Sequence, residues 1–101
     1  MRPTHRTPTH PGEILLEEFL KPLGIPQAAL ARHLGIPLQR VNEIVRGKRG
    51  ISPETAWLLA GAFGTTPDYW VNMQTHHDLA AGRPDRTVRR IRGRRLAPQV
   101  A

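Results

Sequence analysis

Apolar residues recur along most of the chain at the three- and four-residue spacing of amphipathic helices, and no segment shows the alternation of a β-strand. The first helix is predicted at about 11–21, with an inward stripe formed by Leu15, Leu16, Phe19, Leu20 and Leu23. Further helices are predicted at about 26–34, 37–46, 53–63 and 67–80. The pattern therefore predicts an all-α fold of five helices.

Prolines, glycines and capping residues indicate where these helices begin and end. Pro11 suits the first turn of the first helix, and Pro22 with Gly24 is expected to stop it. Ser52 and Thr66 are each followed by a proline, a combination typical of a helix start. A glycine follows each of the two helices that begin there, so both are bounded at either end.

The two middle helices and the turn between them form a distinctive pattern. Ala31 lies where the helices would press together, and Gly35 stands at the turn, where a left-handed backbone is expected. An apolar seam crosses both helices and consists of Leu30, Leu34, Val41 and Ile44. These features together are typical of a helix-turn-helix, which lays its second helix in the major groove of DNA. The plainer alternative is a helical hairpin inside an all-α core.

The outward face of the second helix of this motif carries side chains that suit DNA bases. Gln39 can bind adenine through two hydrogen bonds, Arg40 can bind guanine or a phosphate, and Glu43 can accept from the amino group of cytosine. Leu38 can touch a thymine methyl group. Asn42 lies near the edge of this face, so it either contacts DNA or braces the adjoining loop.

Residues around this helix suit the phosphates of double-stranded DNA. Arg46, Lys48 and Arg49 lie just beyond it, where the DNA backbone is expected to pass. Gln27 opens the preceding helix, beside backbone amides that can also bind a phosphate. The alternative is that Gln27 and the three basic residues are solvated surface residues without a DNA contact. Their position next to the reading helix favours the DNA backbone.

The formal net charge of +7 is carried mainly by the C-terminal segment. Residues 1–81 hold eight basic and seven acidic side chains, whereas 82–101 hold seven arginines and one aspartate. Both this tail and the N-terminal segment 1–9 are predicted to be flexible, which leaves 10–81 as the folded domain. The tail is either a solubilising end or an arm that binds phosphates.

Several classes of function find little support in the sequence. The chain has no cysteine, no apolar run of membrane-spanning length and no signal-type segment, so a cytoplasmic protein without membrane contact is expected. His76, His77 and Asp78 are consecutive and would point in different directions on a helix, so no metal site is predicted. No nucleophile and base form a recognisable set, and we expect neither an enzyme nor a cofactor.

The last predicted helix offers a candidate surface for a second copy. Tyr69, Trp70 and Met73 lie at helical spacing on an element that has few neighbours in so small a domain. Trp70 can equally belong to the core. Because helix-turn-helix proteins usually read two half-sites with two copies, these residues are predicted to form a homodimer interface.

Four segments together carry a resemblance to a known family: HPGEIL (10–15), LKPLG (20–24), RVNEIVRGKRGI (40–51) and FGTTPDYWVNMQ (63–74). With the residues between them, they cover about two-thirds of the chain. They resemble the HigA family of antitoxins, within the phage-repressor-like helix-turn-helix group.

The resemblance implies an antitoxin that neutralises a small, basic RelE-like ribonuclease toxin and represses its own operon by binding operator DNA as a dimer. Such a toxin should favour the acidic first helix, with Glu13, Glu17 and Glu18, over the arginine-rich tail. Two alternatives remain open. One is a solitary helix-turn-helix repressor without a toxin partner, and the other is a protein-interaction module on the same scaffold.

Overall fold

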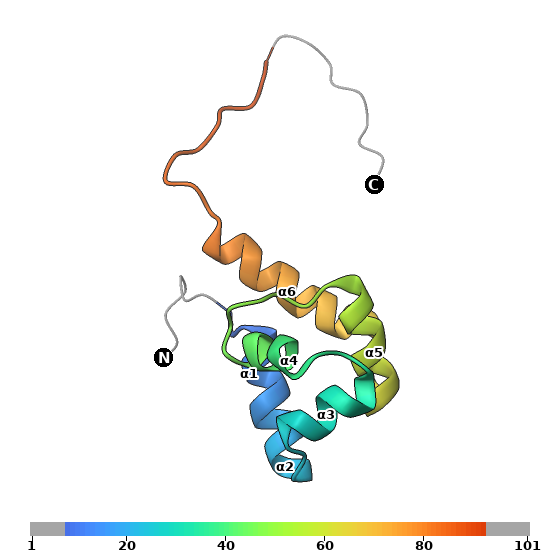
Figure 1. Ribbon diagram of the computed structural model, residues 1–101. Helices are drawn as coiled ribbons and strands as arrows, with labels where there is room; N and C mark the ends of the chain where they lie inside the picture. Colours follow the sequence, from blue (N-terminus) through green and yellow to red (C-terminus); the bar gives the residue numbers. More distant parts are fainter. Residues whose placement is uncertain (1–7, 93–101) are drawn as a thin grey trace.

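The computed structural model describes residues 8–92, which form five helices around one core (Figure 1). These residues contain no strand, and the predicted all-α class is confirmed. Of the two predicted flexible segments, residues 8–9 and 82–92 are described, whereas 1–7 and 93–101 lie outside the described residues. Figure 1 shows the last helix, α6, running across the other helices and projecting beyond them at its C-terminal end.

The first helix is one continuous stretch in three sections, namely α1 (Pro11–Ile14), the π-helical η1 (Leu15–Leu20) and α2 (Lys21–Leu23). His10 caps its start, because the imidazole Nδ1 accepts a hydrogen bond of 2.9 Å from the amide of Gly12. Glu13 follows in the first turn, where a carboxylate suits the positive end of the helix. The predicted start is therefore confirmed, with the capping group now identified.

The end of the first helix differs from its prediction. The amide of Lys21 donates to the carbonyl of Leu16, five residues back, so the hydrogen bonds change register before Pro22 is reached. Pro22 lies one residue beyond this change of register, and the helix passes it although Pro22 has no amide hydrogen to donate. The helix continues to Leu23 and ends at Gly24. Leu23 is 61% exposed and therefore does not belong to the inward stripe.

The two middle helices form as predicted, with α3 at Gln27–Leu34 and α4 at Leu38–Val45. Gly35 between them has a φ of 73°, a left-handed conformation that favours glycine. The turn is closed by a 3.0 Å hydrogen bond from the amide of Ile36 to the carbonyl of Ala31. Ala31 is buried, which agrees with the small residue expected where the helices meet.

Both remaining helices begin at the predicted caps. The hydroxyl of Ser52 accepts from the amide of Thr55 at the start of α5 (Pro53–Phe63). The hydroxyl of Thr66 accepts from the amide of Tyr69 at the start of α6 (Pro67–Ala81). Each cap satisfies a helix amide that would otherwise lack a partner.

All five helices and the loop before α5 contribute to the core. Its buried members are Leu15, Leu20, Leu30, Ala31, Val41, Ile44, Ile51, Ala56, Leu59 and Trp70. Trp70 is fully buried, and its indole Nε1 donates to the hydroxyl of Thr65 at 2.8 Å. Its ring packs near Phe19, with centroids 5.1 Å apart. The assignment of Trp70 to a dimer interface is corrected by this burial, because no part of the side chain is exposed to a second copy.

The start of α1 packs directly against the end of α4. Gly12 is buried, and a Cβ atom at this position would overlap the backbone carbonyl of Ile44. Gly47, just beyond α4, lies beside the ring of His10. The position of the C-terminal end of α4 therefore depends on the absence of a side chain at residue 12.

Candidate nucleic-acid interface

The burial pattern of α4 confirms which of its faces points outward. Val41 and Ile44 are each 1% exposed and anchor the helix in the core. On the opposite side Leu38 is 49% exposed, Gln39 and Arg46 are exposed, and Arg40, Asn42 and Glu43 are half-buried. The helix thus presents a row of polar side chains and one leucine to solvent, and an α-helix is an element that the major groove of DNA admits.

A hydrogen bond joins α4 to the first residue of α3. The Asn42 side-chain amide donates to Oε1 of Gln27 at 3.3 Å, and both side chains are half-buried. Asn42 therefore braces α3 rather than the loop that follows α4. Gln27 is likewise held in place. The two residues were predicted separately as candidates for DNA contact, and the structure brings them together.

Glu43 lies at the centre of a polar network on the outward face. Its carboxylate accepts from Gln39 Nε2 at 3.2 Å and forms an ion pair of 2.9 Å with Arg49 Nε. The hydrogen bond from Arg49 is the main cause that holds the pKa of Glu43 below its usual value, and that from Gln39 is the second. The network places three of the predicted DNA contacts side by side and keeps Glu43 ionised at neutral pH.

Arg40 lies on the other side of this face. Its guanidinium is 4.0 Å from the carboxylate of Glu54, at the edge of an ion-pair contact. Arg40 and Arg49 both line a shallow hollow of about 180 Å³, together with Gly50, Ser52, Glu54 and Thr55. Two guanidinium groups therefore flank the start of α5.

The basic loop after α4, residues 46–50, is held by α6. The side-chain oxygen of Gln74 accepts from the amide of Ile51 at 2.8 Å, and its Nε2 donates to Asp78 at 2.9 Å. Arg46, Lys48 and Arg49 are exposed along this loop, as a phosphate contact requires. The role of Gln74 in holding the loop was not predicted from the sequence. Its partner lies 23 residues away, and a single glutamine on a helix belongs to no recognisable motif.

Two histidines pair beside this loop. The rings of His10 and His77 meet edge to face, with centroids 4.9 Å apart, and Nδ1 of His77 lies 2.9 Å from the carbonyl of Pro8. Burial lowers the pKa of His10, and His77 lowers it further, while Asp78 acts in the opposite direction. His10 thus stays available as the neutral cap of α1. The sequence offered no sign of this partnership between residues 67 positions apart.

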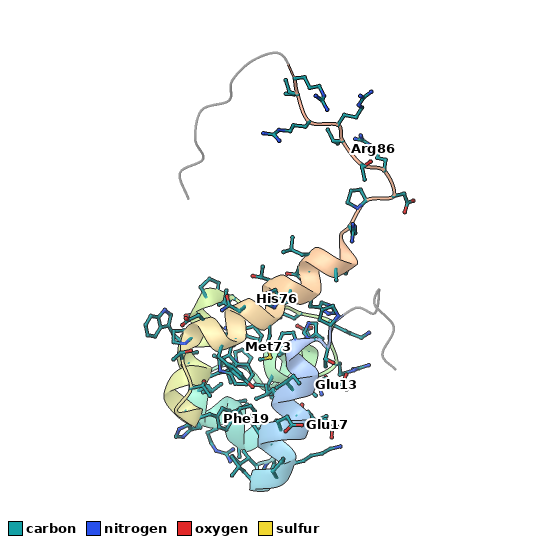
Figure 2. The ribbon with its side chains drawn as sticks, turned by 180° about the vertical axis from the view of Figure 1, so that it is seen from behind. Glu13, Glu17, Phe19, Met73, His76 and Arg86 are labelled. Carbon is teal, nitrogen blue, oxygen red and sulfur yellow. The ribbon has the colours of Figure 1, made fainter. Side chains whose placement is uncertain are left out.

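The acidic side chains of the first helix face solvent. Glu13, Glu17 and Glu18 are all exposed, and Glu17 forms an ion pair of 2.9 Å with Lys21. Figure 2 views the molecule from behind relative to Figure 1 and shows Glu13 and Glu17 along this helix. The carboxylates are accessible, and their role in binding a toxin stays a prediction.

The predicted interface on α6 is only partly exposed. Tyr69 is 40% exposed, while Met73 is half-buried against the core. Trp57 on α5 is 68% exposed and was not singled out from the sequence. An apolar side chain on a helix with many core residues is indistinguishable from a core residue until the helix is oriented.

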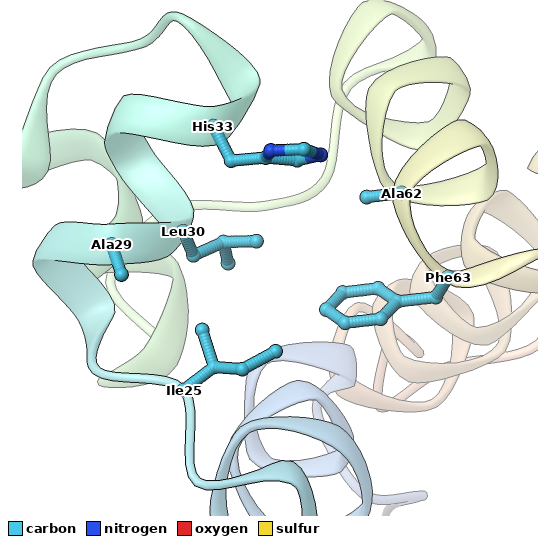
Figure 3. A pocket seen from close by; sticks show the side chains of 6 residues that line it. All are labelled: Ile25, Ala29, Leu30, His33, Ala62 and Phe63. Atoms are coloured by element: carbon cyan, nitrogen blue, oxygen red, sulfur yellow. The ribbon is translucent and has the colours of Figure 1, made fainter.

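A small hollow separates α3 from α5 (Figure 3). It measures about 260 Å³ and is lined by Ile25, Ala29, Leu30, His33, Ala62 and Phe63. His33 is the only titratable side chain in this lining, so the hollow holds no nucleophile paired with a base.

None of the helices in the described residues is long and apolar enough to cross a membrane.

Comparison with known proteins assigns the chain to a family. The helix-turn-helix family matches residues 16–70. The chain is 49% identical over 77 residues to virulence-associated protein I of Dichelobacter nodosus, covering 76% of this chain and 71% of that protein. It is 42% identical over 79 residues to antitoxin HigA-1 of Vibrio cholerae, covering 78% of this chain and 74% of that protein.

A solved structure extends the comparison to the fold. The structure is the Pseudomonas aeruginosa antitoxin HigA with the higBA promoter, at a TM-score of 0.73 and 47% identity. The match covers 74% of this chain and 82% of that one. The chain therefore belongs to the helix-turn-helix family, in the group that includes the HigA antitoxins.

Proposed function

We propose that this protein is an antitoxin that represses its own operon as a dimer and neutralises a RelE-like ribonuclease toxin. The observation that carries the DNA-binding part is the orientation of α4. Its apolar face is buried, and its outward face presents Gln39, Arg40 and Glu43 beside an exposed basic loop. The relative solved with its promoter supports the same use of this fold.

The structure supports a division of roles across this surface. Gln39, Arg40, Glu43 and Leu38 would face base edges, because they lie on the outward side of the reading helix. Arg46, Lys48 and Arg49 would bind phosphates, with Gln27 at the start of α3. Asn42 would act through Gln27, since its amide holds that side chain in position.

The dimer is tested by placing charges at the two predicted interface positions of α6 that are not fully buried. Glutamate at both Tyr69 and Met73 should give a monomer that binds operator weakly, because the two reading helices could no longer be set about 34 Å apart, one turn of DNA. Sedimentation at tens of micromolar protein measures the state, and circular dichroism checks folding.

A second variant tests whether the interface lies on α5 instead. Trp57→Glu changes a side chain that is 68% exposed and lies on α5. If Trp57→Glu alone gives a monomer, the interface lies on α5 instead. Wild-type protein that sediments as a monomer at this concentration would contradict the proposed dimer.

Toxin binding is tested on the acidic first helix. Lysine at both Glu17 and Glu18 should weaken binding of a basic toxin by about tenfold or more, because like charges would then face each other. Operator binding should remain unchanged. The control is Asp85→Lys, a charge reversal at an exposed residue outside the helices. Equal neutralisation by both variants would place the toxin site elsewhere.

The genomic neighbourhood of the gene tests the proposed pairing directly. A short reading frame for a basic protein immediately adjacent to this gene supports an antitoxin, provided that its toxicity is suppressed by co-expression of this chain. A gene without such a neighbour, whose product still binds its own promoter, favours a solitary repressor. Partner binding without promoter binding favours an interaction module.

A further inference from the structure

The middle of α6 contacts the end of the proposed phosphate-binding loop. Gln74 accepts from the amide of Ile51, at the end of that loop, and the backbone of Gly50 lies against the same side chain. From Gln74 to Gly82, the C-cap of α6, the chain rises about 12 Å. The chain therefore leaves α6 about 12 Å along the helix from Gln74, the residue that contacts the end of the loop.

The segment that follows, residues 83–92, is hereafter the arm. Every residue of the arm is exposed, and Pro84 prevents the helix from continuing. Its arginines are Arg83, Arg86, Arg89, Arg90 and Arg92, against a single acidic residue, Asp85. None of these arginines forms an ion pair with another residue between 8 and 92.

The arginines distribute positive charge evenly along the arm. Four of them, at 83, 86, 89 and 92, recur at every third residue. In an extended chain three residues span about 10 Å, and phosphates on one DNA strand repeat about every 3.4 Å along the axis. The ten residues of the arm can reach about 33 Å, close to one turn of DNA.

We propose that the arm binds phosphates of the DNA that flanks the site occupied by α4. This inference rests on the proposed DNA-binding function and adds a second, sequence-independent contact to it. An acidic protein surface is the less favoured occupant, because the arm lacks the buried aromatic residues that anchor many protein interfaces beside arginine. The arm has no aromatic residue, and its two large apolar side chains, Val88 and Ile91, are 79% and 71% exposed.

The arm can be tested without the operator. The measurement is the salt dependence of binding to a random-sequence duplex of about 30 base pairs, which is three turns of DNA. Glutamine at residues 83, 86, 89 and 92 should lower the slope of log affinity against log salt by about 0.9 for each arginine engaged. If two arginines are engaged, the ratio of the wild-type affinity to that of the glutamine variant should fall about tenfold between 50 and 200 mM salt. Lysine at the same four positions is the matched control and should retain most of the slope.

Duplex length locates the contact. Adding about ten base pairs, one turn, on each side of the promoter site should strengthen binding of wild type but not of the glutamine variant. An unchanged salt slope in the glutamine variant overturns the proposal, as does a loss confined to binding of a protein partner. Failure of the proposed function looks different, because wild type would then bind the promoter no better than the random duplex.

Discussion

Alanine at residue 12 is expected to destabilise the fold by about 3 kcal/mol and to displace the C-terminal end of α4. The added Cβ would overlap the carbonyl of Ile44, a backbone atom that cannot move by a simple rotation. The first helix and α4 must therefore separate. Because α4 carries the proposed reading face, operator affinity should fall as well, even at temperatures where Gly12→Ala remains folded.

Gly61→Ala is the matched control for this substitution. Gly61 lies inside α5, and a Cβ there would meet no atom within 4 Å. Alanine loses less conformational freedom than glycine when a helix forms, so this variant should gain about 0.5–1 kcal/mol. Urea denaturation of both variants measures the contrast. If Gly12→Ala were as stable as Gly61→Ala, the close approach of the two helices would be refuted.

Alanine at both Gln39 and Arg40 is expected to weaken operator binding at least about thirtyfold, because each side chain can supply roughly 1–3 kcal/mol of base discrimination. Binding to random-sequence DNA should fall much less, since the phosphate contacts remain. Stability should change little, because Gln39 is exposed and Arg40 makes only a 4.0 Å contact with Glu54.

Binding to operator and random duplexes, measured side by side, checks this expectation. Thr75→Ala removes an exposed polar side chain from α6 and serves as the control. A double variant with wild-type affinity for the operator would show that Gln39 and Arg40 do not face the bases. An equal loss on both duplexes would instead assign them to the phosphates.

Helix ends were predictable where the determining residues are local. Ser52 and Thr66 cap amides three residues away, and the left-handed turn at Gly35 depends on its missing side chain. The first helix ends at Gly24, one of its two predicted stops, but it passes the other, Pro22, a residue that usually breaks a helix. Here a π-helical section shifts the hydrogen bonds ahead of it.

Two hydrogen bonds that position the site could not be predicted, since each joins residues that are distant in the sequence. Asn42 and Gln27 are 15 positions apart, and the partner of Gln74 is 23 positions away. Periodicity shows which face of a helix is apolar but not how many neighbours cover it. For that reason Trp70 was assigned to an interface, although the first helix covers it with Phe19.

The ion pair between Glu43 and Arg49 has a consequence for sequence discrimination. In the proposed complex, a phosphate that draws Arg49 away leaves the Glu43 carboxylate without its cation beside a polyanion. A cytosine amino group compensates that carboxylate, whereas the acceptor atoms of guanine repel it. The reading face would thus select its site chiefly by excluding sequences that leave the Glu43 carboxylate without a hydrogen-bond donor.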